Sequence, residues 1–75
     1  MLARLPNAHA KDVIKALERA GFLFDHQTGS HAYYRHPITR NATTVPVHSK
    51  ELPRWLLKKI IRQAGLTEDE FRGLS

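Results

Sequence analysis

The chain has 75 residues and a mass of 8.6 kDa, a length that corresponds to a single domain over residues 1–75 and excludes a multidomain enzyme. A domain of this size buries one small core, so any active site must be shallow. Twelve Lys and Arg residues against seven Asp and Glu residues give a formal net charge of +5, which favours a polyanionic partner such as nucleic acid. The absence of cysteine excludes disulfides, thiolate catalysis and Cys-ligated zinc.

Apolar runs are short throughout the sequence. The longest hold three residues, at Phe22–Phe24 and Trp55–Leu57, whereas a transmembrane helix needs about 18. The first residues, Met1–Asn7, lack the apolar stretch and the small-residue cleavage pattern of a secretory signal. We therefore expect a cytoplasmic protein without a membrane partner.

The first predicted helix covers Ala8–Ala20. Gly21 supplies the left-handed residue that ends a helix, and Phe22 follows where a hydrophobic contact onto the last turn is expected. Asn7 is the better chemical candidate for the N-cap, with His9 as the alternative. The helix is amphipathic because its apolar residues recur at helical spacing: Ala10, Val13, Ile14, Leu17 and Ala20.

Three short strands follow. Phe22–Gln27 and Ser30–His36 are rich in aromatic residues, and the break between them at Thr28-Gly29 predicts a hairpin. Thr43–His48 is the third strand. Pro46 has no amide proton to donate, which favours the sheet edge for this strand.

The second predicted helix runs from Pro53 to Ala64 and ends at Gly65. Its buried stripe consists of Leu56, Leu57, Ile60, Ile61 and Ala64. Thr67-Glu68-Asp69-Glu70 reads as the capping box of a short third helix, Glu68–Leu74. The residues placed to form its hydrophobic staple are Leu66 and Phe71.

This order of elements predicts an α+β fold. Two amphipathic helices can cover one face of a small three-stranded antiparallel sheet, and the opposite face then stays open to water. The open face is where chemistry can happen.

Metal and serine-triad chemistry find no support in the sequence. Ser30 precedes His31 without the Gly-x-Ser-x-Gly elbow of serine hydrolases. The histidines include no His-x-x-x-His pair on a predicted helix, so we expect neither a metal site nor a cofactor. These histidines are His9, His26, His31, His36 and His48.

Gly29-Ser30-His31 is the most informative stretch, because it places an imidazole at the start of a strand, directly after a tight turn. There the ring is held rigidly and stays exposed to solvent. If Thr28-Gly29 forms the turn, His26 opposes His31, although the register stays open at this point. A merely polar strand position is the alternative interpretation of His31.

Four sequence blocks carry a resemblance to a known family: Ala20–Phe22, Gly29–His31 with Tyr34, Thr44–His48 and Ile61–Thr67. In their order and separations they resemble the HicA, or YcfA-like, family of toxin ribonucleases from bacterial type II toxin–antitoxin systems.

The resemblance implies a double-stranded-RNA-binding-like fold and the activity of an mRNA interferase, which cuts transcripts. It also implies that His31 is the catalytic residue, and that a HicB-type antitoxin binds the toxin and covers this histidine. His9 stands where the family often has serine.

RNA carries its own nucleophile, the 2′-hydroxyl, so cleavage needs no metal. A histidine with a pKa of about 6.5 can take the 2′-hydroxyl proton at neutral pH. Trp55 can stack on a base, or it packs against a neighbouring element. We expect RNA contacts from Ser30, Arg35, Lys50, Arg54 and Lys58, without an assigned role for any single cation.

Two other classes of function stay open on the sequence. The chain can be an RNA-binding module of the same fold that cleaves nothing, or an interaction protein that only holds its partner. His31 is the discriminating feature, because a protein that only binds RNA has no need of an imidazole at this strand start.

Overall fold

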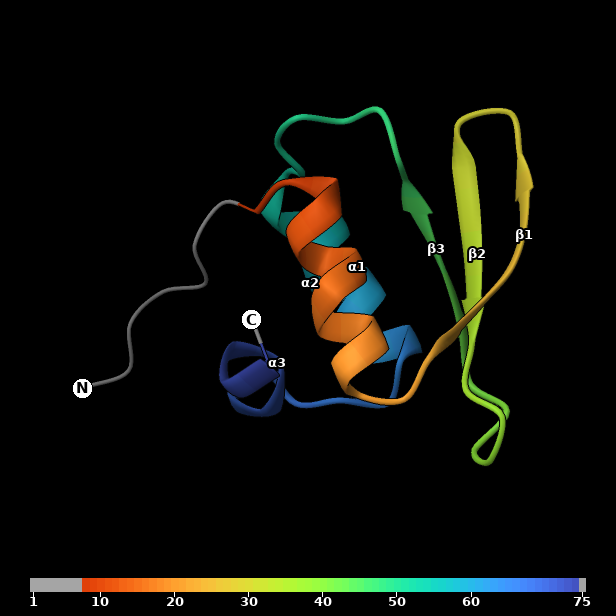
Figure 1. The fold of residues 1–75 in the computed structure, drawn as a ribbon. Coiled ribbons are helices and arrows are strands. Elements are labelled where there is room, and N and C mark those ends of the chain that lie inside the picture. Colours follow the sequence, from red (N-terminus) through yellow and green to blue (C-terminus); the bar gives the residue numbers. More distant parts are fainter. Residues whose placement is uncertain (1–7, 75) are drawn as a thin grey trace.

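The structure is a computed structural model and describes residues 8–74. Its elements are α1 (Ala10–Arg19), β1 (Leu23–Thr28), β2 (His31–Arg35), β3 (Ala42–Pro46), α2 (Arg54–Gln63) and α3 (Glu68–Leu74). The strands form an antiparallel sheet in the order β1-β2-β3. Helices α1 and α2 pack against it, and α3 packs against these two helices (Figure 1). The predicted α+β fold is confirmed, and β3 lies at a sheet edge as Pro46 indicated. None of the helices in residues 8–74 is long and apolar enough to span a bilayer.

Both long helices end in the predicted glycine motif. After α1, the amide of Phe22 donates to the carbonyl of Leu17 at 2.9 Å, and the amide of Gly21 donates to Glu18 at 3.0 Å. These two bonds define a Schellman motif, which needs a left-handed residue, and Gly21 has a φ of 99°. Helix α2 ends in the same way at Gly65, whose φ is 74°.

The helix starts differ slightly from the prediction. Helix α1 begins two residues late because Ala8 is extended and pairs with Leu52, whose amide donates to the Ala8 carbonyl at 2.8 Å. His9 is the N-cap and makes no side-chain capping bond, while Asn7 lies outside the described residues. Pro53 is the N-cap of α2 instead of a first-turn residue, since its ψ of 151° is extended and not helical.

The β1–β2 turn decides the register that the sequence left open, and the Thr28-Gly29 turn is not the one formed. The turn residues are Gly29 and Ser30, so Thr28 pairs with His31, and His26 pairs with Tyr33 instead of His31. Gly29 takes the positive φ of the turn, 59°, while the β-branched Thr28 remains in the strand.

Side chains of the central strand alternate between two environments. Ala32 and Tyr34 are buried, together with their β3 partners Val45 and Thr43. Helix residues complete this core, and each fully buried Leu or Ile contributes about 1.5–3 kcal/mol. The largest fully buried side chains are Leu17, Leu52, Leu57, Ile60, Val13 and Val45.

His36 organises the β2–β3 turn. Its Nδ1 accepts the amide protons of Ile38 and Thr39 at 3.1 and 3.2 Å, so Nδ1 carries no proton. Its ring meets Phe22 edge to face, with centroids 5.3 Å apart. A Cβ on Gly21 would come within 2.8 Å of this ring, so His36 also fills the space beside the end of α1. This histidine has a structural role.

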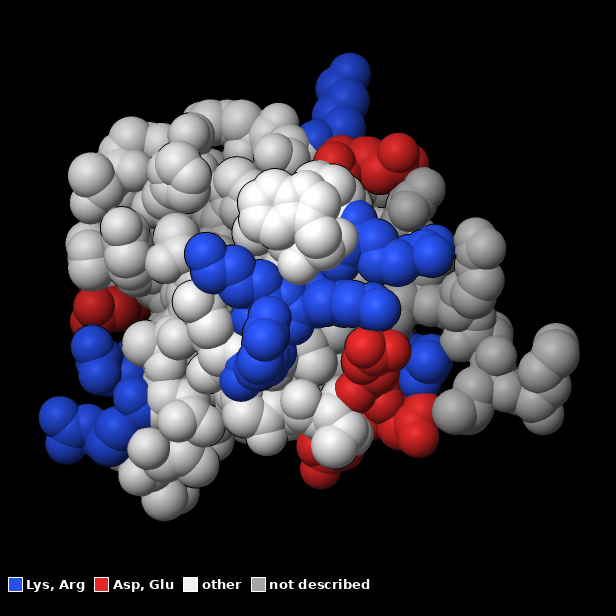
Figure 2. Space-filling model, turned by 180° about the vertical axis from the view of Figure 1, so that it is seen from behind, with Lys and Arg blue, Asp and Glu red and all other residues white. Residues whose placement is uncertain are grey.

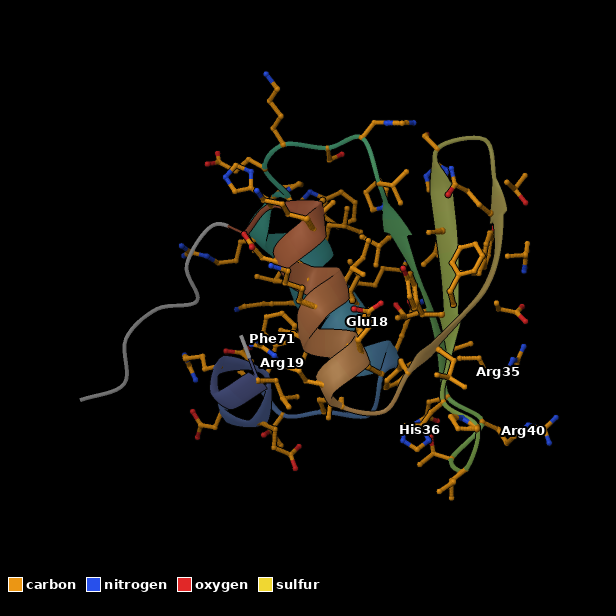
Figure 3. All side chains as sticks on the ribbon, viewed as in Figure 1. Glu18, Arg19, Arg35, His36, Arg40 and Phe71 are labelled. Atoms are coloured by element: carbon orange, nitrogen blue, oxygen red, sulfur yellow. The ribbon has the colours of Figure 1, made fainter. Side chains whose placement is uncertain are left out.

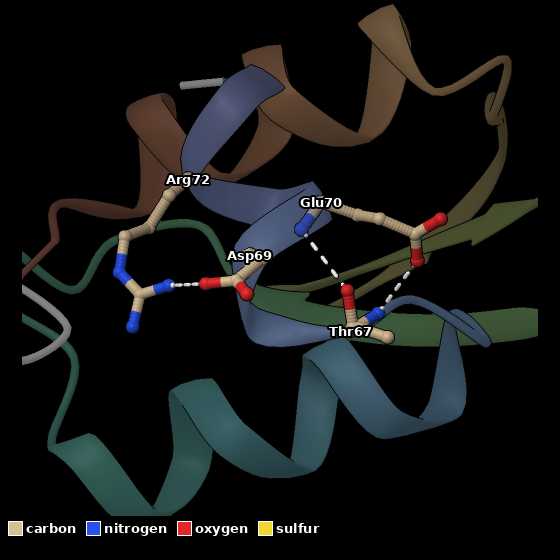
Figure 4. Close-up of polar contacts among 4 residues, drawn as sticks. All are labelled: Thr67, Asp69, Glu70 and Arg72. Carbon is tan, nitrogen blue, oxygen red and sulfur yellow. Dashed lines mark hydrogen bonds and ion pairs between the residues drawn. The ribbon is translucent and has the colours of Figure 1, made fainter. Parts of the chain in front are cut away.

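The capping box of α3 is confirmed. The amide of Thr67 donates to Glu70 Oε1 at 2.8 Å, and the amide of Glu70 donates back to Thr67 Oγ1 at 3.1 Å (Figure 4). On the flanks of the box, Leu66 is half-buried and Phe71 is buried, and both pack into the core. The cap therefore stabilises the start of α3, and the packing of Phe71 and Leu66 holds the helix against the rest of the fold.

We expect Thr67→Ala to lower the free energy of unfolding by about 1 kcal/mol, because the substitution removes the oxygen that caps α3. Thr67→Ser keeps this oxygen and is the matched control. Urea unfolding measures both. A Thr67→Ala midpoint equal to that of the parent would contradict a stabilising role for the cap.

Burial raises the pKa of the Tyr34 phenol above its ordinary value of 10.0, and the negative charge of Glu18 on α1 raises it further. Figure 3 labels Glu18 on the helix beside the sheet. Because the folded state holds this proton more tightly, the unfolded chain ionises first as the pH rises.

Stability should therefore fall as the pH increases through about 10, since the folded state then binds more protons than the unfolded state. Tyr34→Phe removes this contribution. In urea unfolding from about pH 9 to about pH 11, the variant should lose less stability than the parent. At neutral pH, the difference in the free energy of unfolding between the two proteins gives the separate cost of losing the hydroxyl. Parallel pH profiles of the two proteins would contradict a raised pKa of Tyr34.

Candidate functional site

A shallow groove of about 220 Å³ lies between the edge strand β3 and helix α2. One part of its lining comes from the sheet and the other from the helix. The lining residues include His31, Thr44, Pro46, Leu56, Lys59 and Gln63. The predicted catalytic residue, His31, and a cation of α2, Lys59, therefore line the same groove.

His31 is the first residue of β2 and is exposed, as the sequence indicated. It pairs with Thr28 on one side and with Pro46 on the other, so both neighbouring strands hold its backbone. The preceding residue, Ser30, accepts the amide proton of Val47 through its carbonyl at 2.8 Å. The imidazole therefore stands on a well-fixed strand start beside Ser30.

Helix α2 supplies the other part of the groove. Leu56, Lys59 and Gln63 follow one another at spacings of three and four residues, which places them on one face of the helix. Gln63 is fixed at the sheet because the Thr43 hydroxyl donates to its Oε1 at 2.9 Å. This face turns Lys59 toward the space that His31 lines.

Sequence reasoning missed Lys59 because it followed cations that repeat every four residues. That repeat selects Arg54, Lys58 and Arg62, which lie on a different face of α2. The position three residues after the half-buried Leu56 was the available signal for Lys59.

The structure does not gather the predicted RNA-binding residues at one point. Lys58 and Arg62 line a second hollow of about 450 Å³, next to α3. Lys50 lines a third, of about 430 Å³, together with His9, Lys11 and His48. Of the residues predicted to act on RNA, His31 is the one that lines the groove.

Arg35 lies at the opposite end of β2 from His31. The four residue steps of strand between them span about 13 Å. Its Nη1 donates to the carbonyl of Arg40 at 3.4 Å, and both arginines lie near the β2–β3 turn in Figure 3. Arg35 is thus remote from the groove.

The face that carries α2 is rich in cations. Figure 2 shows Lys and Arg side chains gathered near the centre of this face. Trp55, at the start of α2, is 67% exposed. Most of its surface therefore faces solvent, which leaves the indole accessible to a ligand. The exposed cations of α2 are Arg54, Lys58, Lys59 and Arg62.

The groove combines an exposed imidazole, an ammonium group and an amide. An imidazole can exchange a proton with a bound hydroxyl, and an ammonium group can stabilise negative charge that develops beside it. Among residues 8–74, no three His, Asp or Glu side chains gather in a way that could hold a metal ion.

Comparison with known proteins gives a family assignment. Residues 10–66, more than half of the chain, match the family described as HicA toxin of bacterial toxin-antitoxin. The sequence matches none of the curated proteins. The matched span runs from the start of α1 past the end of α2, so it includes both sides of the groove. The chain therefore belongs to the HicA toxin family of bacterial toxin–antitoxin systems, and this membership implies an antitoxin partner.

Proposed function

We propose that this protein is a metal-independent endoribonuclease, an mRNA interferase that cuts transcripts in the cytoplasm, with His31 as its catalytic residue. The observation that carries the proposal is the position of His31. It is an exposed imidazole on a fixed strand start, lining the same groove as Lys59. Membership of a toxin family supports the same conclusion.

In the proposed reaction, His31 takes the proton of a ribose 2′-hydroxyl, and the resulting oxyanion attacks the adjacent phosphorus. The ammonium group of Lys59 stabilises the negative charge that builds up on the phosphate oxygens. The RNA strand supplies the nucleophile, so the reaction needs no covalent enzyme intermediate.

The remaining cations bind the RNA backbone on either side of the reacting phosphate. Lys50, in the loop between β3 and α2, lines the third hollow, and Lys58 on α2 lines the second. Ser30 directly precedes His31. Arg54 lies beside the exposed Trp55, which can stack on a base. Arg35, at the far end of β2, contacts the RNA backbone farther from the reacting phosphate. A HicB-type antitoxin that covers His31 would prevent access of RNA to this surface.

His31→Ala should lower the rate of RNA cleavage by about 10²–10⁴-fold, the usual contribution of a general acid or base. The fold should survive, because the side chain is exposed. Cleavage of a single-stranded RNA and induced toxicity in cells measure the effect. His9→Ala removes another exposed histidine, outside the groove, and is the control. A His31→Ala protein that cuts RNA like the parent would leave only RNA binding or partner binding as functions.

Lys59→Gln should slow cleavage at saturating RNA and also reduce the slope of log affinity against log salt by about 0.7, the value for one phosphate contact on a single strand. Lys15→Gln removes an exposed cation of α1 and is the charge-matched control. Filter binding at several salt concentrations and single-turnover cleavage measure the two quantities. Equal behaviour of the two variants would rule out a role for Lys59 at the reacting phosphate.

A further inference from the structure

A second histidine is held in place on the open face of the sheet. His26 Nδ1 and Asp25 Oδ2 lie 2.8 Å apart. The His26 ring also stacks on Tyr33, with centroids 4.3 Å apart and an angle of 7° between the planes. A carboxylate can only accept, so Nδ1 donates the proton of this bond. Nε2 makes no hydrogen bond to any group in residues 8–74, and it is the nitrogen available to a ligand.

A β-bulge creates this arrangement. The ladder between β1 and β2 shifts between Phe24 and His26, so Asp25 is an extra residue without a partner on β2. In a regular strand, neighbouring side chains point to opposite faces. The irregularity at Asp25 allows its carboxylate to reach the ring of the next residue. Bulges are often found beside active sites because they redirect a side chain.

His26 and His31 are diagonal neighbours on the same face. His26 pairs with Tyr33, and His31 precedes Tyr33 by two residues on β2. Diagonal neighbours of an antiparallel pair are separated by about 7–8 Å at the backbone. The stack on Tyr33 holds the His26 ring over the central strand, which is the strand that carries His31.

The proposed cleavage needs a second proton-transfer group. When the 2′-oxygen attacks, the 5′-oxygen leaves from the opposite side of the phosphorus and must be protonated. One imidazole beside the 2′-oxygen cannot also reach the leaving oxygen. Ammonium and guanidinium groups hold their protons too tightly to be efficient acids near neutral pH, whereas an imidazole is suited to this task.

We propose that His26 is the general acid of the cleavage reaction and that Asp25 is its positioning residue. The inference rests on the proposed ribonuclease function. As His31 accepts the 2′-hydroxyl proton, the bond between the 2′-oxygen and phosphorus forms and the bond to the 5′-oxygen breaks. Protonated His26 gives its Nε2 proton to the 5′-oxygen. The products are a 2′,3′-cyclic phosphate and a 5′-hydroxyl, and exchange with water restores both rings.

The test compares two substrates that differ in the leaving atom. One is an RNA oligonucleotide with a mapped cleavage site, and the other carries sulfur in place of the bridging 5′-oxygen at that site. A thiolate leaves without protonation, so the sulfur substrate does not need a general acid. His26→Phe keeps an aromatic ring to stack on Tyr33 and removes the proton, and Asp25→Asn removes the positioning charge. Circular dichroism checks the fold of each variant.

His26→Phe should cut the oxygen substrate about 10²–10⁴-fold more slowly than the parent. It should cut the sulfur substrate within a few-fold of the parent rate. Asp25→Asn should show the same pattern with a smaller loss. His31→Ala should be slow on both substrates, because each needs the 2′-hydroxyl proton removed.

A His26→Phe protein that cuts the oxygen substrate like the parent overturns the acid role and leaves the ribonuclease function standing. So does a slow variant that sulfur fails to rescue, since this result assigns His26 to structure or binding. A parent protein that cuts neither substrate overturns the proposed function and this inference together.

Discussion

The alternation of side chains along the central strand is the constraint on which the rest of the molecule depends. Strand β2 is paired on both sides, so its backbone cannot rotate to expose a different set of residues. Ala32 and Tyr34 must then enter the core, and His31 and Tyr33 must face away from it. A register slip of one residue would bury the imidazole of His31 and expose Ala32 and Tyr34. Hydrophobic packing on the helix side of the sheet thus fixes the positions of His31 and Tyr33 on the opposite side.

The groove follows from the edge position of β3. No strand covers the outer side of β3 within the described sheet, and α2 lies beside this strand. A polyanionic chain can enter from solvent without any element having to open. The exposed imidazole of His31 and the ammonium group of Lys59 then line one groove from two elements that the core holds together. The site is shallow for the same reason that the domain is small, because little surface remains to enclose it.

The sequence predicted the elements and the antiparallel sheet, and it left open the register of β1 against β2. Helix ends and the cap of α3 depend on local chemistry, so Gly21, Gly65 and the Thr67 box could be read directly. The hairpin register depends on which residue takes the left-handed turn conformation, and both Thr28-Gly29 and Gly29-Ser30 fit that pattern. The groove depends on packing of α2 against β3, which no local pattern encodes. For this reason the exposed position of His31 was predicted and its proximity to Lys59 was not.

The extra residue of β1 has a consequence for how this strand tolerates change in length. Without Asp25, Phe24 and His26 would be consecutive, and each would still face its present partner on β2. A shortened hairpin would therefore preserve the pattern of the sheet and lose only the carboxylate. The strand pairing therefore accommodates the acidic residue without depending on it.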